Sequence, residues 1–319
     1  MLRVFLIYLS QVAWARNLIT HWNFAKRTAS RFVAGEELKD VIRVIKILNS
    51  KGLEATIDHL GEHSANEELA KKATEEIINI FDAIHRSGVR ANVSIKLTQI
   101  GLAIDEDLCA QNLQEILEFA GANNNFTRLD MEDSSCVDQT LALYWRMRTQ
   151  NFTNLGIVIQ AYLMRSEQDV HSILEGGGRI RLCKGAYQES PEIAFPKKRE
   201  VDANFEKLTE VMIDWIVKHG APIQINNGRI PPIPAIATHD PSLIAFSKSY
   251  ANRVNLSKQA IEFQMLFGIR RDLQVGLVEE GYPVRVYVPY GTEWYPYFMR
   301  RLAERPANLW FFISNFFRQ

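Results

Sequence analysis

The stretch from residue 92 to residue 132, NVSIKLTQIGLAIDEDLCAQNLQEILEFAGANNNFTRLDME, predicts the fold of this chain. Its two ends, residues 92–99 and 127–132, are short apolar runs typical of buried strands. Residues 105–122 between them have a helical pattern that opens on an acidic cap and closes near a glycine. A strand, a helix and a second strand in this order predict one βα unit of a parallel sheet, followed by the start of the next.

The rest of the chain from residue 54 repeats this alternation. The segment 66–88, for example, starts on an asparagine and ends on a glycine, as helices often do. We expect eight strands, at residues 54–61, 92–99, 127–132, 156–162, 180–186, 234–240, 262–268 and 284–291. Eight βα units in roughly 250 residues predict an α/β fold of the TIM-barrel type, (βα)8. A doubly wound parallel sheet is the structural alternative that strand counting leaves open.

Composition limits the classes of function. The chain has 319 residues, 47% of them hydrophobic, so it can bury a large core. Its 37 basic residues balance 37 acidic ones, so no net field draws the whole molecule to nucleic acid or to an anionic membrane. Three scattered cysteines, Cys109, Cys136 and Cys183, argue against a zinc site and against a disulfide framework. We therefore expect a cytoplasmic protein without a metal.

The two ends of the chain differ from its repeating part. Residues 1–50 carry no acid before Glu36, and their apolar run VFLIYLS is too short to span a membrane. We expect these residues to form helices that pack on a catalytic barrel of residues 51–308; a transit peptide is the alternative. The apolar tail, residues 309–319, is expected to pack on the barrel. A non-enzymatic alternative is that both ends form a membrane-associated scaffold.

Polar residues of one parity mark the interior of the expected barrel, because alternate residues of each strand point inward. Val93 and Ile95, for example, oppose Ser94 and Lys96. Five strands carry a polar or charged inward residue near their C-terminal ends, namely Lys96, Asp130, Gln160, Arg181 and Tyr287. Burying such groups is costly without partners, so we expect a binding site where they converge at one mouth. Mutual neutralisation, as between Lys96 and Asp130, is the structural alternative.

The segment TEWYPYFMRRLAERPAN, residues 292–308, follows the eighth expected strand. One face of a helix here would carry Tyr297, Arg300, Arg301 and Glu304, at spacings that an ordinary barrel helix fills with apolar residues. A solvated face with an Arg300–Glu304 ion pair is one interpretation. The other is that the helix lies across the mouth and presents two arginines to a carboxylate, which guanidinium geometry suits.

Several common catalytic motifs are absent from the sequence. Neither GxGxxG after a strand nor GxxxxGK(S/T) occurs, so neither a Rossmann nicotinamide site nor a P-loop is predicted. A Schiff-base aldolase on the same barrel, with Lys96 or Lys184 as its nucleophile, is an alternative enzyme class. His239, in the sixth expected strand, fits either a core histidine or a member of the site.

The ordered motifs of the chain resemble those of one family. They are VSIKLTQIG (93–101), RLDMED (128–133), RLCKGAYQE (181–189), ATHD (237–240) and RVYVPYGTEWYPYFMRRLAERPAN (285–308). In this order they are similar to the motifs of proline dehydrogenase, specifically the monofunctional bacterial type, from about residue 30 to residue 308. The resemblance implies a distorted (βα)8 barrel that holds FAD without a Rossmann fold, with N-terminal helices and a final helix over the barrel mouth.

The resemblance also implies a reaction, the first step of proline catabolism to glutamate. L-proline gives up a hydride from C5 to flavin N5 and becomes Δ1-pyrroline-5-carboxylate, and the electrons pass to a membrane quinone. A separate pyrroline-5-carboxylate dehydrogenase would use the product, and a weak peripheral contact with the inner face of the cell membrane is expected. Methylenetetrahydrofolate reductase, another flavin barrel, is an alternative, but its large pterin substrate does not call for an arginine pair on a lid helix.

The family's functional residues, carried over by position, form three groups. The substrate-binding residues would be Lys96, Leu266, Tyr287, Tyr297, Arg300 and Arg301. The cofactor-binding residues would be Met131, Gln160, Arg181, Lys184, Gly185, Ala186, Tyr187, Thr238, His239 and Glu304. The catalytic residues would be Lys96, Asp130, Arg181, Tyr287, Arg300 and Arg301.

Within these groups the resemblance implies individual roles. The two arginines of the lid helix and Lys96 would hold the substrate carboxylate, while two tyrosines and Leu266 would enclose the ring. Asp130 would lie beside this pocket and help to fix its neighbours. Arg181 would lie near flavin N5 and stabilise the negative charge of the reduced ring. Gly185 would let the backbone approach the cofactor at a point where a Cβ would collide with it.

Overall fold

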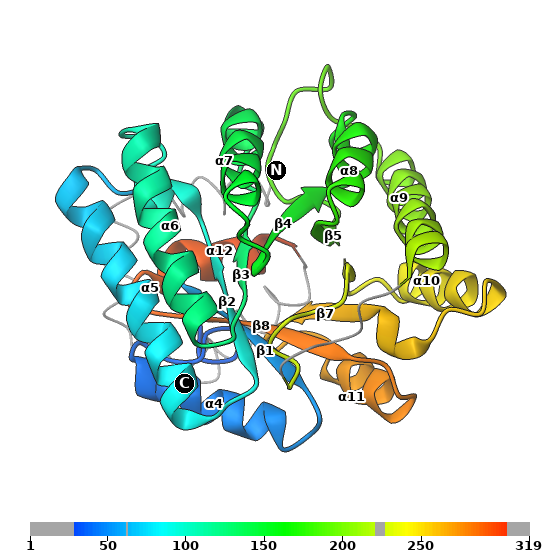
Figure 1. The fold of residues 1–319 in the computed structure, drawn as a ribbon. Coiled ribbons are helices and arrows are strands. Elements are labelled where there is room, and N and C mark those ends of the chain that lie inside the picture. Colours follow the sequence, from blue (N-terminus) through cyan, green and yellow to red (C-terminus); the bar gives the residue numbers. More distant parts are fainter. Residues whose placement is uncertain (1–28, 62, 221–226, 305–319) are drawn as a thin grey trace.

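The computed structural model describes residues 29–61, 63–220 and 227–304, with side chains described as far as Arg301. Eight parallel strands close into one barrel in chain order (Figure 1). They are β1 (Glu54–His59), β2 (Ala91–Ile95), β3 (Thr127–Leu129), β4 (Leu155–Gln160), β5 (Arg179–Cys183), β6 (Pro234–Ala237), β7 (Glu262–Leu266) and β8 (Val284–Tyr290). Because β1 pairs with β8, the sheet has no free edge. The predicted (βα)8 barrel is confirmed, and the doubly wound alternative is wrong.

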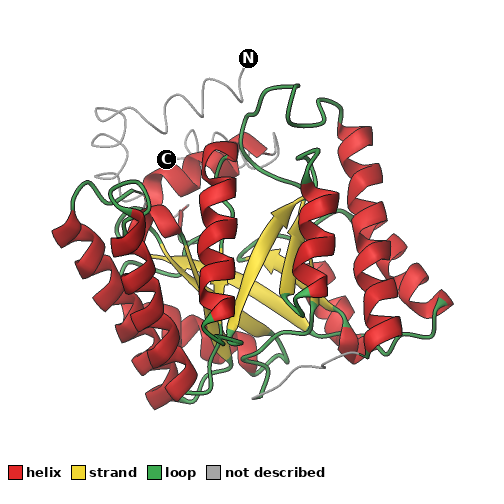
Figure 2. Cartoon of the chain, turned by 45° about the horizontal axis from the view of Figure 1, so that its top comes forward, coloured by secondary structure: helices red, strands yellow, loops and turns green. Residues whose placement is uncertain are grey.

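Seven helices follow the first seven strands and surround the barrel (Figure 2). They are α5 (Glu67–Ser87), α6 (Glu106–Ala122), α7 (Val137–Thr149), α8 (Ser166–Glu175), α9 (Lys198–His219), α10 (Pro241–Arg253) and α11 (Arg271–Glu279). Asn66 caps α5 and Asp105 caps α6, each by accepting a hydrogen bond from the backbone N–H three residues on. Gly88 then ends α5 with a φ of 66°. These two helices lie where their sequence patterns predict them.

Short 3₁₀ helices fill some of the connections, at η1 (Leu97–Ile100), η2 (Ser134–Cys136) and η3 (Lys258–Ala260). The predicted strands all exist, but most of them run too far toward their C-terminal ends. β2, for example, ends at Ile95 and β3 at Leu129, so Lys96 and Asp130 lie just beyond the ladder. The long connection after β5 ends at Lys198, where α9 begins.

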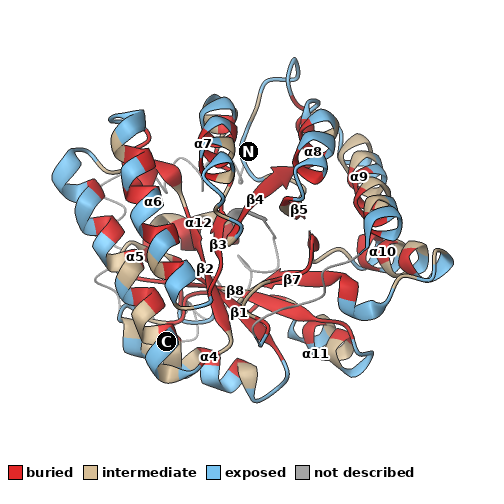
Figure 3. Cartoon of the chain, in the orientation of Figure 1, coloured by how far each residue is buried: buried red, intermediate tan, exposed pale blue. Residues whose placement is uncertain are grey.

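The barrel wall is buried on both sides, as Figure 3 shows. Outward residues such as Ile57 and Val93 pack against the helices, and the inward residues Thr56 and Asn92 join through a hydrogen bond of 2.6 Å between Oγ1 and Oδ1. The interior of this barrel is therefore polar over much of its depth. Many of its side chains bond to one another or to main-chain carbonyls, and they do not form the layers of aliphatic residues that such barrels commonly contain.

Two helices at the ends of the described chain depart from a regular barrel. α4 (Leu38–Asn49) packs against β1, β8 and α5, the place in the ring that the helix after the eighth strand would normally take. α12 (Trp294–Glu304) instead packs with Leu60 and Ile269, which follow the C-terminal ends of β1 and β7. α12 therefore covers the mouth of the barrel, toward which the strand arrows in Figure 2 point.

Residues 29–36 hold α12 in this position. The backbone N–H of Gly291 donates to the carbonyl of Gly35 at 3.0 Å, and Nε1 of Trp294 donates to Oε1 of Glu36 at 3.2 Å. The expected helices before residue 29 and the expected apolar tail, residues 309–319, lie outside the described residues. In the part that is described, no helix is both long and apolar enough to cross a membrane.

Candidate active site

A cluster of polar side chains centred on Asp130 lies at the mouth of the barrel. Oδ1 of Asp130 accepts hydrogen bonds from Oγ of Ser94 at 2.5 Å and from a terminal nitrogen of Arg181 at 2.9 Å. Its Oδ2 accepts from the hydroxyl of Tyr287 at 2.6 Å. Side chains from β2, β5 and β8 thus meet on one carboxylate that follows β3. We call Asp58, Ser94, Lys96, Asp130, Arg181 and Tyr287 the mouth cluster.

Lys96 joins this cluster as a cation between two carboxylates. Its Nζ lies 2.7 Å from Oδ1 of Asp58 and 3.7 Å from Oδ2 of Asp130. Burial alone would lower the pKa of Lys96, but the two negative charges outweigh burial and raise this pKa. The amine therefore stays protonated at neutral pH. A Schiff-base aldolase needs a neutral amine, so this environment disfavours that alternative for Lys96.

Tyr287 keeps its proton for a related reason. Burial and the negative charge of Asp130 raise the pKa of Tyr287 well above its ordinary value. The phenol is therefore a hydrogen-bond donor at neutral pH, and Asp130 is its acceptor. The guanidinium carbon of Arg181 lies 5.3 Å from the centroid of the Tyr287 ring, so the two side chains also interact through a cation–π contact.

Gln160, at the end of β4, has an acceptor that no described protein group satisfies. Its Nε2 donates to the carbonyls of Met131 and Glu132 at 3.2 and 3.3 Å, which fixes the orientation of the amide. Its Oε1 is buried and has no hydrogen-bond partner among the described residues. A buried acceptor without a donor is uncommon in folded proteins, so this atom indicates a place where a ligand can donate an N–H or O–H group.

Lys184 belongs to a different group of charges. Its Nζ donates to Oδ1 of Asp202 at 2.5 Å and to Oδ2 of Asp240 at 2.9 Å, and Lys198 also contacts both carboxylates. Burial alone would raise the pKa of Asp202 and Asp240, but their hydrogen bonds with Lys184 outweigh it and lower both. We call these four residues the rim cluster. Lys184 is thus held at the strand end by two carboxylates, outside the mouth cluster.

The loop after β5 bears on the expected cofactor contacts. Gly185 has a φ of 109°, and a Cβ built on it would lie 2.2 Å from a ring carbon of Tyr162. A side chain at position 185 would collide with this ring, so a glycine is required there. The predicted approach of this backbone to a cofactor stays a prediction. Ala186 and Tyr187 are exposed on the same loop. Glu189 connects this loop to the loop after β3, because its carboxylate accepts hydrogen bonds from the backbone N–H and the hydroxyl group of Ser134.

Thr238 and His239 are bonded within the protein. Oγ1 of Thr238 accepts a hydrogen bond from the backbone N–H of Asp240 at 3.1 Å. Nε2 of His239 accepts from the backbone N–H of Leu266 at 2.9 Å, so a neutral ring carries its proton on Nδ1. His239 therefore joins the loop after β6 to the end of β7, and it positions Leu266 at the mouth. The site role expected for each of them stays a prediction.

On α12, Tyr297 is buried and packs in the cluster that covers the mouth. The guanidinium carbon of Arg301 lies 5.1 Å from the centroid of this ring, and Arg301 is only 9% exposed. This face of the helix is thus not simply solvated, although Arg300 is less deeply buried than its neighbour. The side chain of Glu304 lies outside the described residues, so its expected contacts stay predictions.

Sequence reasoning missed Asp58 and Gln264 as partners in the mouth. Asp58 holds Lys96, and Oε1 of Gln264 accepts from Nε of Arg181 at 2.5 Å. Both residues have the inward parity of their strands, which they share with Glu54 and Glu262 respectively. The parity test that selected Lys96 would have found them if it had been applied to β1 and β7.

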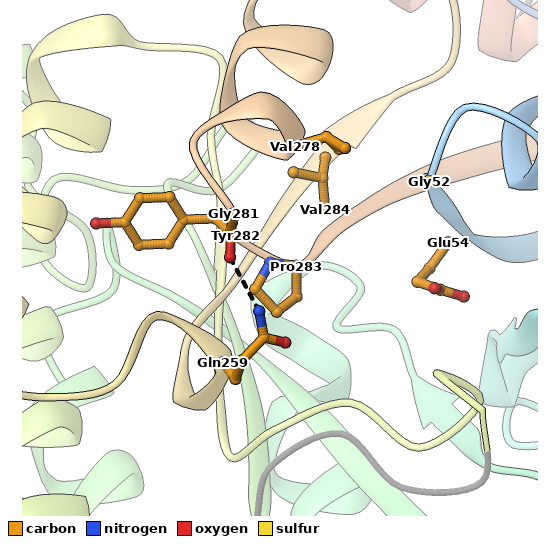
Figure 4. A pocket seen from close by; sticks show the side chains of 8 residues that line it. All are labelled: Gly52, Glu54, Gln259, Val278, Gly281, Tyr282, Pro283 and Val284. Carbon is orange, nitrogen blue, oxygen red and sulfur yellow. Dashed lines mark hydrogen bonds between the residues drawn. The ribbon is translucent and has the colours of Figure 1, made fainter.

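The opposite end of the barrel has a pocket of about 230 Å³, shown in Figure 4. Glu54 and Val284, at the starts of β1 and β8, line it, and the amide of Gln259 crosses it to the carbonyl of Gly281 at 2.9 Å. It contains no member of the mouth cluster. Among the described residues, no group of histidine, cysteine and carboxylate side chains could hold a metal ion.

Known proteins resemble this chain in sequence and in fold. Residues 41–313 match the family model described as Proline dehydrogenase. The chain is 42% identical to Proline dehydrogenase 1 of Bacillus subtilis over 91% of both chains. It is 38% identical to Proline dehydrogenase of Deinococcus radiodurans, over 92% of this chain and 90% of that one.

Solved structures give the same fold. Proline utilization A (PutA) from Bdellovibrio bacteriovorus, inactivated by N-propargylglycine, superposes with a TM-score of 0.78 and 26% identity over 88% of this chain. PutA from Bradyrhizobium japonicum, at 20% identity and a TM-score of 0.70, is similar in fold. The present chain spans 33% and 31% of these two PutA chains.

Proposed function

The chain belongs to the proline dehydrogenase family and oxidises proline in the first step of proline catabolism, and we propose that a hydride moves from C5 of L-proline to N5 of FAD. The family implies a flavin as the cofactor, and FAD is the form that the motifs of the sequence imply. The product would be Δ1-pyrroline-5-carboxylate. The observation that supports this reaction most directly is the mouth cluster, which holds a guanidinium, an ammonium and a phenol around one carboxylate.

The described residues fit a flavin ring at this mouth. The buried Oε1 of Gln160 accepts from no donor in the described part of the chain, and a ring that carries N–H groups would supply one. Arg181 would provide a fixed positive charge beside a ring that gains negative charge on reduction. When bound, the flavin supplies the hydride acceptor; the protein supplies the binding, the orientation and the charge around it.

The same residues fit a small cyclic amino acid. Lys96, kept protonated by its carboxylate neighbours, is a permanent cation for the substrate carboxylate, and Arg300 with Arg301 on α12 would complete the grip. Tyr287, Tyr297 and Leu266 would form the walls around the ring. With α12 packed over the mouth, the pocket would exclude water and strengthen each of these interactions.

Asp130 would orient this site rather than exchange protons. Its two oxygens already accept three hydrogen bonds, from Ser94, Arg181 and Tyr287. Both oxygens of the carboxylate are therefore already engaged. It would fix the guanidinium and the phenol in one arrangement before the substrate enters, which reduces the reorganisation that the reaction requires.

We propose that a quinone accepts the electrons and that a separate pyrroline-5-carboxylate dehydrogenase uses the product. Bifunctional protein PutA of Escherichia coli, which this chain matches over 23% of that protein's length, supports a linked second function. A weak peripheral contact with the membrane would bring the flavin to its quinone. Flotation of the purified protein with liposomes tests that contact, and protein that stays at the bottom of the gradient would count against it.

Anaerobic addition of L-proline to the purified protein tests the main proposal. The yellow absorbance of the flavin should bleach, and Arg300→Ala and Arg301→Ala should each raise the proline concentration needed for half-maximal bleaching. Gln259→Ala, at the opposite end of the barrel, is the matched control and should leave that concentration unchanged. A colourless protein, or a yellow one that L-proline does not bleach, would contradict the proposal.

A further inference from the structure

A continuous hydrogen-bonded column runs through the barrel from its floor to its mouth. Nε and a terminal nitrogen of Arg285 donate to the two oxygens of Glu262 at 2.9 and 3.0 Å. Nε2 of Gln264 donates to Oε1 of Glu262 at 2.6 Å. Oε1 of Gln264 then accepts from Nε of Arg181 at 2.5 Å. All four side chains are buried, and each has at most 5% of its surface exposed.

The chemistry of the column allows Gln264 one orientation. Arg181 has only donors, and the carboxylate of Glu262, held by two hydrogen bonds from Arg285, has only acceptors. The amide lies between them, so its oxygen must face the guanidinium and its nitrogen the carboxylate. A flipped amide would lose both hydrogen bonds. It would place its N–H donors against the guanidinium and its oxygen against the carboxylate, which is costly in a buried site.

The base of the column is anchored to the main chain. Terminal nitrogens of Arg285 donate to the carbonyl of Ala55 at 2.7 Å and to the carbonyl of Gly228 at 2.5 Å. These acceptors belong to β1 and to the loop before β6, so the fold itself fixes Arg285. The fixed guanidinium in turn fixes Glu262, and Glu262 fixes the amide of Gln264.

At the top, Arg181 is held on two edges. One terminal nitrogen donates to Asp130 at 2.9 Å and to Ser94 at 3.1 Å, while Nε is held by Gln264. Without Gln264, only the Asp130 edge would remain, and the guanidinium plane could rotate about it. The plane that Arg181 presents to the mouth therefore depends on the amide of Gln264, which is bonded directly to it.

We propose that Gln264 is a positioning residue, which fixes the guanidinium plane of Arg181 so that its charge faces the flavin ring. This inference rests on the proposed function, because it assumes that Arg181 serves the flavin. In this role Gln264 acts through Arg181 and not by its own contact with the substrate or the cofactor. Its effect appears in the properties of the bound flavin and in the rate of hydride transfer, more than in the affinity for proline.

Gln264→Met tests the proposal, because methionine has a similar volume and neither donates nor accepts as an amide does. Asn112→Leu is the matched control, since Asn112 is also a buried amide, bonded at 2.9 Å to the carbonyl of Ile100 on the outer side of the barrel. In Gln264→Met the midpoint reduction potential of the bound flavin should become more negative, and kcat should fall about tenfold while KM changes less than about twofold. The control should lower the unfolding temperature by a similar amount and shift neither the potential nor kcat.

Gln264→Glu keeps the size and the acceptor for Arg181, but it places a second carboxylate against Glu262, so its flavin potential should fall further than that of Gln264→Met. If the methionine variant does not fold, this variant still tests the positioning role of Gln264. If L-proline bleaches the wild-type flavin but the midpoint reduction potential of the flavin is unchanged in the Gln264 variants, only the positioning role is overturned. A wild-type protein that L-proline does not bleach would instead overturn the proposed function.

Discussion

Buried charges lie both at the mouth of this barrel and at its floor, the end where the strands begin. The two ends satisfy these charges with different kinds of hydrogen-bond partner. Arg128, at the floor, is 1% exposed and donates to the main-chain carbonyls of Ile157 and Arg179. Arg181, at the mouth, is 5% exposed and donates to side chains of the described residues, Asp130 among them. Burial does not distinguish the two arginines. The type of partner does, because main-chain acceptors are fixed by the fold, whereas side-chain acceptors can be shared with a ligand.

The floor is closed by a short segment of main chain. Residues 228–231, before β6, present carbonyl groups upward: Gly228 to Arg285, Arg229 to Asn92 and Pro231 to Arg179. A Cβ on Gly228 would lie 2.5 Å from the carboxylate of Glu54, so a glycine is needed for this close approach. We expect substitutions at the floor to change stability, and substitutions at the mouth to change activity.

Asp130→Asn should show the largest effect on activity. The amide cannot accept from both Arg181 and Tyr287 as the carboxylate does, and it removes the charge that orients them. We expect kcat/KM for L-proline to fall by about 10²- to 10³-fold, with an unfolding temperature close to that of the wild type. Asp107→Asn, which removes an exposed carboxylate paired with Arg146, is the control. A fall of less than fivefold in kcat/KM would contradict the assignment of the barrel mouth as the active site.

Glu262→Ala should show the largest effect on stability. It leaves the buried guanidinium of Arg285 without its carboxylate, and breaking a buried pair in this way typically costs about 3–5 kcal/mol in the free energy of unfolding. Urea denaturation would measure this change. Glu167→Ala removes one partner of the exposed pair with Lys207 and should cost less than about 1 kcal/mol. Equal losses in both variants would show that the floor network does not stabilise the fold.

The sequence predicts the face of each strand but not the depth along it. Arg128 and Asp130 lie on the same face of the same short segment, two residues apart, and the alternating pattern treats them alike. One belongs to the floor and the other to the mouth, because the tilt and stagger of neighbouring strands set the depth. The eight strands, the caps of α5 and α6, and the polar inward residues Lys96, Asp130, Arg181 and Tyr287 could thus be predicted, whereas Asp58 was missed. The column through Gln264 could not, because its partners come from strands far apart in the sequence.

Arg128→Met tests whether a second buried charge at the floor stabilises the fold as Glu262 does. Two nitrogens of Arg128 are buried without a described partner, and burial lowers its pKa well below the ordinary value for arginine. A base whose folded-state pKa is lowered opposes folding while it is charged, so an apolar replacement relieves a penalty. We expect the free energy of unfolding to change by less than about 1 kcal/mol, since the lost bonds to carbonyl groups offset this relief. A loss as large as that of Glu262→Ala would place Arg128 among the stabilising charges.

Asp240→Asn should have the smallest effect, because the rim cluster is partly exposed. Asparagine still caps α10, where Asp240 accepts from the N–H of Ser242, so the substitution removes only the charge facing Lys184. The pKa of Asp240 is lowered in the folded protein, so its stabilising contribution is present above the ordinary pKa of an aspartate and is lost as the pH falls through the lowered value. Variant and wild type should differ by less than about 1 kcal/mol in urea denaturation at pH 7, and the difference should vanish as the pH falls through the lowered pKa of Asp240. A difference that persists at the lower pH would show that Asp240 stabilises the rim through packing rather than through its charge.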